Sequence, residues 1–300
     1  MREKFVEGYE AINVSLNSIT LKIGKLIWDA YKMTWVKYQE IEYDPTNEII
    51  KKACFDVINN KALPTPKESI KFNFKIENVS RVCLAQITRG RIGWWFNVES
   101  QMPQYLNHGV TIPLNIAKSK FDARVKDMII ETQKLYEEMA KEGFPPQDLR
   151  YLCMHGQQTS MVADCNFAAL PGFFMMRAEN GLTDELNLVA RMMKREIYNK
   201  VYDAYYNNFL DVLEYDLWNT MLSKLDCLGS KQKLCMITDK VLGNTGRFPS
   251  ANDDVASPEG KIKPDFDFKK SAWFLELKRL NKNLLFPGEE EMIKTWNNGK

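Results

Sequence analysis

The chain has 300 residues, enough for one large hydrophobic core or two modest ones. Hydrophobic residues make up 45% of it and charged residues 27%, proportions that exclude a disordered or fibrous chain. The 41 basic and 39 acidic residues leave a net charge of +2, so no whole-protein field would draw the chain to nucleic acid or to a membrane surface. Any bound anion must therefore be held by a local group of cations.

Only two histidines are present, His108 and His155. This scarcity argues against zinc sites and histidine-based acid–base catalysis. The six cysteines include no Cys-x-x-Cys pair, so we interpret them as reduced thiols of a cytosolic protein. The N-terminus shows no signal-peptide core, and no uncharged run approaches the ~18 residues of a membrane span. We expect a cytoplasmic protein without a membrane segment.

The first half of the chain shows both helical and strand periodicities. Apolar residues at three- and four-residue spacing predict an amphipathic helix over residues 18–38, and a second helix is predicted over residues 47–59. The Pro64-Thr65-Pro66 segment predicts an extended connection. Strict alternation of apolar and polar residues over 70–76 predicts a strand with one buried face.

The second half is dominated by helices. A long helix is predicted over 119–141, and another begins near Thr183 and is followed by more helix to about Lys224. These elements predict an α+β fold in which an antiparallel sheet is flanked by long helices. Residues 1–242 are predicted to form the main domain, 243–264 a linker, and 265–300 a helical C-terminal extension.

The most informative stretch contains Arg89, Gly90 and Arg91 directly after an apolar run. Two guanidinium groups beside a glycine are suited to clamp a diphosphate. The same pattern is also explained if the two arginines are surface residues on a turn and bind no ligand. Trp94 and Trp95 follow, and such aromatics beside arginines also suit single-stranded nucleic acid, although the neutral net charge argues against nucleic acid.

A second polar group contains Arg150, Asn166 and Arg177, each next to an apolar run. Such charges are typical of helix ends as well as of ligand sites, and the Phe and Met residues between them are typical of a core.

The order of residues required for a Ser-His-Asp triad, a phosphate-binding Gly-x-x-x-x-Gly-Lys loop or a metal site is absent from the sequence. Hydrolase and zinc chemistry are therefore excluded.

Taken in chain order, these segments resemble the flavin-dependent thymidylate synthases, over about residues 45–200. The corresponding residues are Phe72-Asn73-Phe74, Ser80-Arg81, Gln86, Arg89-Gly90-Arg91, Phe96, Ser100, Arg150-Tyr151, Asn166, Phe173, Arg177 and Glu185.

The chain also departs from the family's motifs. Gly90 replaces the central histidine of Arg-His-Arg, Glu68-Ser69 stands for an upstream Glu-His pair, and the arginine expected shortly after Ser100 is missing. Asn-Ala-Arg has become Asn166-Phe167-Ala168, and a histidine expected near residues 180–181 is absent. These departures fit a diverged member, of the kind that viruses carry for making modified nucleotides, which would then work in the host cytoplasm.

The resemblance implies a homotetramer whose active sites form between subunits. It implies C5 methylation, or related one-carbon transfer, of a pyrimidine deoxynucleotide such as dUMP, with FAD as cofactor and methylenetetrahydrofolate and NADPH as co-substrates. The roles that it implies for individual residues are these: Arg89, Gly90, Arg91 and Asn166 hold FAD; Gln86, Ser100 and Arg150 hold the nucleotide phosphate and Glu99 its sugar; Arg177 faces the pyrimidine and is the catalytic residue.

A second interpretation remains open. The missing histidines and the C-terminal residues outside the resemblance also fit a catalytically inactive descendant that binds a nucleotide or nucleic acid, or has a structural role. A third interpretation is that the protein binds RNA through the Arg-Gly-Arg segment and the tryptophans.

Overall fold

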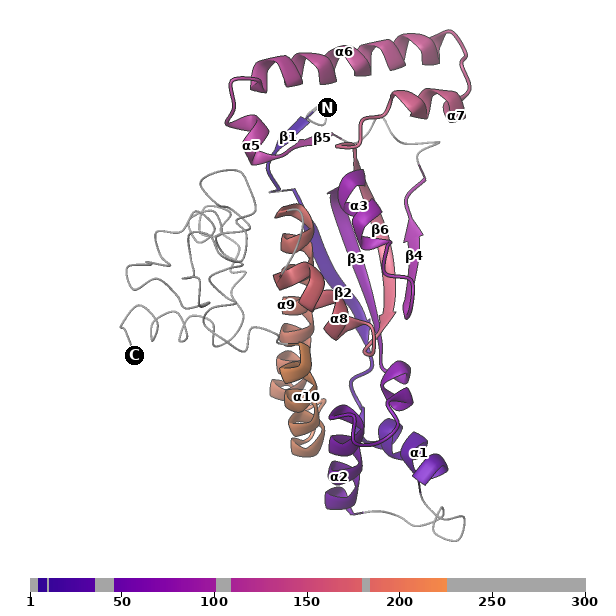
Figure 1. Cartoon of the computed structure of the whole chain (residues 1–300), viewed down its shortest axis with the longest axis vertical. Helices are drawn as coiled ribbons and strands as arrows, with labels where there is room; N and C mark the ends of the chain where they lie inside the picture. The colour runs from indigo at the N-terminus through magenta and orange to yellow at the C-terminus, as the bar shows by residue number, and fades with distance from the viewer. Residues whose placement is uncertain (1–4, 10, 36–45, 101–108, 180–183, 226–300) are drawn as a thin grey trace, which may run out of the picture. The chain divides into compact units, whose positions relative to one another are not determined.

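The computed structural model describes residues 5–9, 11–35, 46–100, 109–179 and 184–225 (Figure 1). In chain order, its elements are β1 (Phe5–Glu7), β2 (Asn13–Ile19), α1 (Gly24–Trp35), α2 (Asn47–Ile58), the 3₁₀ helix η2 (Thr65–Ser69), β3 (Lys71–Ser80), α3 (Arg81–Ile87), β4 (Trp94–Val98), β5 (Val110–Ile112), α5 (Leu114–Ala117), α6 (Asp122–Lys141), α7 (Pro146–Leu149), the 3₁₀ helix η4 (Arg150–Leu152), β6 (Gln158–Asn166), α8 (Leu170–Phe174), the π-helix η5 (Met175–Glu179), α9 (Asp184–Tyr206) and α10 (Val212–Leu225). This mixture confirms the predicted α+β class.

The main sheet is antiparallel and has the strand order β2-β3-β6-β4. Along β3, Phe72, Phe74 and Ile76 are buried while Lys71 and Lys75 are exposed, so the alternation seen in the sequence is that of a half-buried strand. A separate pair, β1 and β5, is parallel. Three-residue strands are too short to show a period, which explains why this pair was not predicted.

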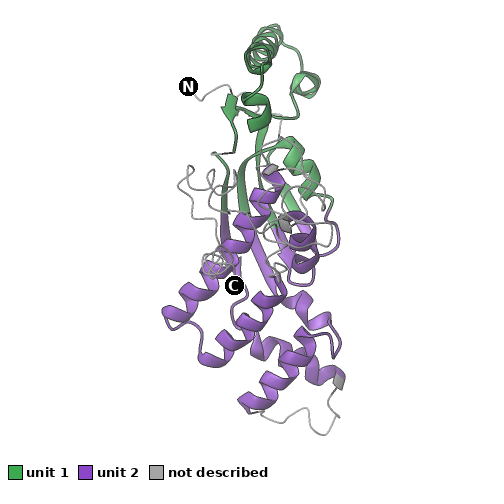
Figure 2. Ribbon diagram, turned by 60° about the vertical axis from the view of Figure 1, so that its left-hand side comes forward, with its two compact units in different colours: residues 1–14, 75–89, 96–163 green, residues 15–74, 90–95, 164–300 purple. Residues whose placement is uncertain are grey.

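The described chain divides into two compact units (Figure 2). Unit 1 comprises residues 1–14, 75–89 and 96–163, and unit 2 comprises 15–74, 90–95 and 164–300. All four strands of the main sheet contribute residues to both units. The division is therefore not one between successive segments of the chain, which is why composition along the sequence gave no hint of it.

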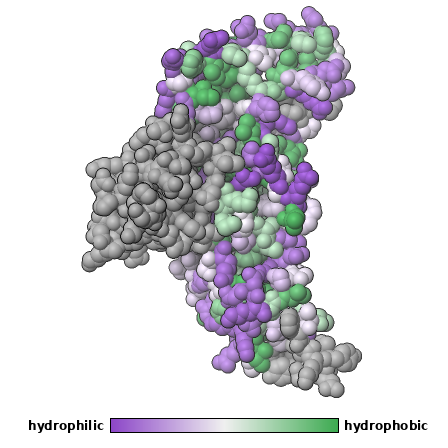
Figure 3. All heavy atoms as spheres, in the orientation of Figure 1, coloured by the Kyte–Doolittle hydropathy of each residue, from purple (hydrophilic) through white to green (hydrophobic). Residues whose placement is uncertain are grey.

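The core of unit 1 lies between α6 and the parallel strand pair. Val110, Ile112 and Ile129 are buried there, and Phe5 and Val125 pack against them. The outward side of α6 carries polar residues together with the exposed Met128 and Leu135 side chains. On the face that Figure 3 presents, hydrophobic and hydrophilic side chains are accordingly interspersed.

The core of unit 2 is aromatic. The ring of Phe72 lies 6.2 Å from that of Trp218 in an edge-to-face arrangement and 6.5 Å from that of Phe167. The indole nitrogen of Trp218 donates to the carbonyl of Leu21 at 2.7 Å, so this buried polar atom is satisfied. Helices α1, α2 and α10 pack on one another in this unit (Figure 1).

Helix α2 and helix α6 confirm the helices predicted over 47–59 and 119–141. The helix predicted over 18–38 begins too early, because residues up to Ile19 belong to β2, where polar and apolar positions alternate. The predicted extended connection at residues 64–66 is wrong in part, because η2 begins at Thr65. Pro66 fits the first turn of η2 because the first amides of a helix have no acceptor within the helix, so the missing N–H of proline breaks no helical hydrogen bond. The predicted linker and C-terminal extension lie outside the described residues.

Candidate functional site

In unit 2, Asn166 ends β6 and has a fixed side chain. Its backbone amide donates to the carbonyl of Gly93 at 3.0 Å, and its Oδ1 accepts from the amide of Ala169 at 3.1 Å. The residue is only 6% exposed. Because its Oδ1 accepts from a backbone N–H, its Nδ2 donor faces the other way and makes no hydrogen bond to the residues described.

The neighbouring Arg-Gly-Arg segment and the two tryptophans have different environments. Arg91 is exposed and makes no ion pair within the described ranges, so its guanidinium is available to an anion. Trp94 is buried against Phe173, with ring centroids 4.8 Å apart, and is a core residue. Trp95 is 54% exposed, and the ammonium of Lys71 lies 5.0 Å from its ring centroid. Only the second tryptophan has a face suited to stacking.

Arg177 lies on the π-helix η5, also in unit 2. Single π turns widen a helix locally and are frequent at functional sites. The residue is 9% exposed, yet its guanidinium makes no hydrogen bond or ion pair with any part of the chain that the structure describes. A nearly buried cation without a counter-charge is costly, and a bound ligand with oxygen acceptors would offset that cost.

The backbone around Arg177 is held by a residue that the sequence did not single out. The Nδ2 of Asn187, on α9, donates to the Arg177 carbonyl at 3.0 Å, and Asn187 is itself buried. A π-helix leaves carbonyls without their usual i+4 amide, so a side-chain donor stabilises the turn. Glu185, Arg191 and Lys194 on the same helix are buried too.

In unit 1, Gln86 lies on α3 and its side chain is partly buried. Its Oε1 is shielded from solvent and accepts no hydrogen bond from the described residues. An orphaned acceptor of this kind calls for a donor from a ligand or water. Arg89, three residues later, is exposed.

Glu99 and Ser100 follow β4 in the same unit. The amide of Ser160 donates to a carboxylate oxygen of Glu99 at 3.1 Å, and the amide of Glu99 donates to the carbonyl of Ser160 at 2.9 Å. The reciprocal bonds fix the orientation of the carboxylate. Ser100, the next residue, is exposed.

Arg150 is exposed at the start of η4 and has a second cation close by, Arg81. Burial lowers the pKa of Arg81, the nearby Cys153 opposes this effect, and the like charge of Arg150 lowers it further. Burial also raises the pKa of the Cys153 thiol, against the attraction of Arg81. The two arginines are thus close enough for their charges to interact.

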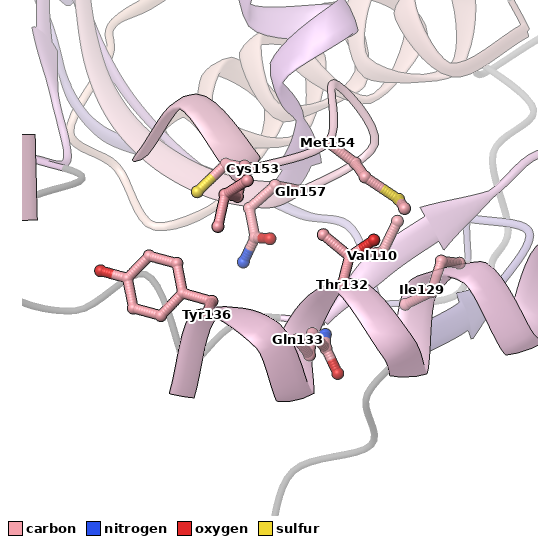
Figure 4. A pocket seen from close by; sticks show the side chains of 9 residues that line it. Val110, Ile129, Thr132, Gln133, Tyr136, Cys153, Met154 and Gln157 are labelled. Carbon is pink, nitrogen blue, oxygen red and sulfur yellow. The ribbon is translucent and has the colours of Figure 1, made fainter. Parts of the chain in front are cut away.

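A small pocket in unit 1 is lined from one side by α6 and from the other by β5 and residues 152–157 (Figure 4). Ile129, Thr132 and Tyr136 line it from the helix. Its volume of about 20 Å³ holds roughly one water molecule. It is too small for a nucleotide or a flavin.

The structure therefore places the predicted residues in two sets, each within its own unit. Unit 2 contains Gly90, Arg91, Asn166 and Arg177, and unit 1 contains Gln86, Arg89, Glu99, Ser100 and Arg150.

Among the described residues, no cluster of three or more His, Cys, Asp or Glu side chains could hold a metal ion. His155 is exposed, and His108 lies outside the described residues. Within the described part of the chain, no helix is long and apolar enough to cross a bilayer.

Comparison with known proteins assigns the chain to a family. The profile described as Thymidylate synthase complementing protein (Thy1) matches residues 18–201. The chain belongs to this family. All of the predicted site residues, from Gln86 to Arg177, lie within the matched range, whereas α10 lies outside it.

Relatives in the Thy1 family are distant. A flavin-dependent thymidylate synthase of Pyrococcus abyssi is 28% identical over 193 residues, which cover 62% of this chain and 79% of that protein. Another, of Saccharolobus solfataricus, is 27% identical over 190 residues, which cover 62% and 72%. The solved UMP/dUMP methylase PolB of Streptomyces cacaoi has a TM-score of 0.52 at 14% identity and covers 71% of this chain and 97% of its own. At that identity the similarity shows a shared fold.

Proposed function

We propose that this Thy1 protein is a flavin-dependent enzyme that methylates C5 of a pyrimidine deoxynucleotide such as dUMP, or transfers a related one-carbon unit to it. The named relatives are flavin-dependent thymidylate synthases, and the structural neighbour acts on UMP and dUMP. The ordered arginines of the family pattern are retained at Arg89, Arg91, Arg150 and Arg177.

The observation that carries the proposal is the nearly buried guanidinium of Arg177, which makes no hydrogen bond or ion pair with the described residues. A guanidinium directed at the carbonyl edge of a pyrimidine stabilises the negative charge that develops in the ring when C5 becomes nucleophilic. Asn187 fixes the backbone of the π turn from which this side chain extends.

The residues in unit 2 fit a flavin. Asn166 offers a donor at Nδ2, Arg91 offers an exposed cation for a diphosphate, and Trp95 offers a partly exposed ring. Arg89, the other residue that the resemblance assigns to FAD, belongs to unit 1 and is exposed. Bound FAD would supply the hydride, NADPH would supply the electrons that reduce it, and methylenetetrahydrofolate would supply the carbon. Gly90 removes the histidine of the family motif but keeps both arginines, so flavin binding survives in this proposal.

The residues in unit 1 fit the nucleotide. Gln86, Ser100 and Arg150 bind the phosphate in this proposal, and the anchored Glu99 carboxylate meets the sugar. The loss of the family arginine after Ser100 removes one charge-assisted hydrogen bond, worth about 1.5–3 kcal/mol. Arg81, close enough to Arg150 for their charges to interact, compensates for part of that loss. A homotetramer with sites between subunits is part of the same proposal.

Turnover tests the proposal. Purified protein is incubated with FAD, NADPH, methylenetetrahydrofolate and either dUMP or dCMP, and the nucleotides are analysed by mass spectrometry. We expect one substrate to gain the mass of a one-carbon unit. The Arg177→Ala variant should lose this activity while it still binds FAD, whereas Arg124→Ala, which removes an exposed arginine of α6, should retain it.

Two results would contradict the assignment. Unchanged turnover in Arg177→Ala would refute the catalytic role of that residue. Binding of FAD and nucleotide without any turnover would instead support a catalytically inactive descendant.

A further inference from the structure

Gly93 lies directly beneath the side chain of Asn166, within unit 2. Its φ of +74° is in the left-handed region that favours glycine, and its carbonyl accepts the amide of Asn166. A Cβ added at Gly93 would lie 2.6 Å from Oδ1 of Asn166 and 3.0 Å from its Cγ and Nδ2. The carboxamide therefore rests on the glycine with no room for a methyl group.

The carboxamide cannot easily move away from such a methyl group. Its Oδ1 is held by the Ala169 amide, and the residue is almost fully buried. Rotation would break the bond to Ala169 and turn Nδ2 away from its present direction. The bond to Ala169 and the space left by the missing side chain at Gly93 therefore together set the direction in which the Nδ2 donor points.

We propose that Gly93 is a positioning residue that orients the Asn166 carboxamide, so that Nδ2 donates to an acceptor on the bound flavin. The ligand part of this inference rests on the proposed function. Acceptors of the required chemistry are the carbonyl oxygens and unprotonated ring nitrogens of an isoalloxazine. The contact between Gly93 and Asn166 is a property of the protein alone.

A matched pair of glycines separates the steric contact from backbone strain. Gly143 has a φ of +88°, and a Cβ added there meets nothing within 4 Å. Gly93→Ala and Gly143→Ala therefore both place alanine in a left-handed conformation, and only the first displaces Asn166. Titration of FAD fluorescence, well below the lowest melting temperature, should show FAD affinity about tenfold weaker in Gly93→Ala and unchanged in Gly143→Ala.

Asn166→Asp tests the donor without disturbing the glycine. Aspartate has nearly the same shape and still accepts from Ala169, but it replaces the Nδ2 donor with an acceptor. We expect FAD affinity to fall about tenfold or more in a titration carried out well below the melting temperature of the variant, which the buried carboxylate lowers. Wild-type affinity in Asn166→Asp would overturn the donor role.

A double-mutant cycle with Asn166→Ala tests the coupling. Once the carboxamide is removed, Gly93→Ala should lower the melting temperature only as much as Gly143→Ala does and should not weaken FAD binding further. Additive effects of the two substitutions would overturn the positioning role.

Failure of the proposed function has a different signature. A wild-type protein that binds no FAD would refute the flavin assignment and with it the ligand part of the inference. The effects of Gly93→Ala and Asn166→Ala on the melting temperature would still be non-additive if Gly93 positions the Asn166 carboxamide.

Discussion

Glu214 joins α10 to the first turn of α1, and its removal gives a quantitative test of the fold. Its carboxylate accepts from the amide of Ile23 at 2.8 Å and from that of Gly24 at 3.0 Å, and the side chain is buried. The approach is close, since a Cβ at Gly24 would lie 3.0 Å from Oε1 and the carboxylate would have to shift slightly. Glu214 therefore caps α1 from a residue 190 positions away in the sequence.

Glu214→Ala leaves two amides without an acceptor. Each unsatisfied buried donor costs about 1–3 kcal/mol, and removal of a buried charge offsets part of the total, so we expect a loss of about 2–4 kcal/mol. For a protein of this size that corresponds to a melting temperature lower by roughly 3–6 °C. Glu214→Gln keeps one acceptor and should lose about half as much.

Urea denaturation followed by circular dichroism measures these losses. Glu138→Ala, at an exposed position of α6, is the matched control and should change stability by less than about 0.5 kcal/mol. A Glu214→Ala variant as stable as this control would refute the capping role.

The same residue predicts a pH dependence. Burial raises the pKa of Glu214 above its usual 4.5, and the amides of Gly24 and Ile23 oppose this effect. The folded state thus binds the proton up to a higher pH than the unfolded state does, so the contribution of Glu214 to stability is largest below pH 4.5. It falls as the pH rises from there through the raised pKa. The stability advantage of the wild type over Glu214→Gln should therefore narrow with rising pH, and a widening gap would contradict the assignment.

Two further predictions concern the nucleotide site and the core. Arg150→Ala should raise the KM for the nucleotide about 10–100-fold with little change in kcat, because it removes one charge-assisted contact to the phosphate. An unchanged KM would exclude Arg150 from the site. Phe72→Ala should destabilise the protein by about 3–5 kcal/mol in urea denaturation, since its ring is buried against Phe167 and Trp218. A loss below about 1 kcal/mol would show that these contacts are not formed.

Local patterns predicted the regular elements well. The alternation in β3 and the apolar face of α6 are periodic over enough residues to identify a strand and a helix. The boundary between β2 and α1 was harder to predict, because apolar residues continue from the strand into the helix. The strand is defined by its pairing with β3, which a local pattern does not show. The parallel partner of β1 is a strand about 100 residues later, a contact that no local window contains.

In the candidate site, too, contacts between residues far apart in the sequence could not be predicted. The order of the arginines and of Asn166 was enough to predict the family. The support given to Arg177 by Asn187, the proximity of Arg81 to Arg150 and the contact between Gly93 and Asn166 all depend on tertiary structure. Gly93 had a local signal, a glycine beside the Arg-Gly-Arg segment, but its partner lies 73 residues further along the chain.

Flavin binding is measured by the visible absorption spectrum of the purified protein, recorded before and after addition of FAD and removal of unbound flavin. We expect the absorption bands of an oxidised flavin to remain with the protein, either as purified or after reconstitution. A colourless protein that retains no added FAD would contradict the proposed flavin dependence.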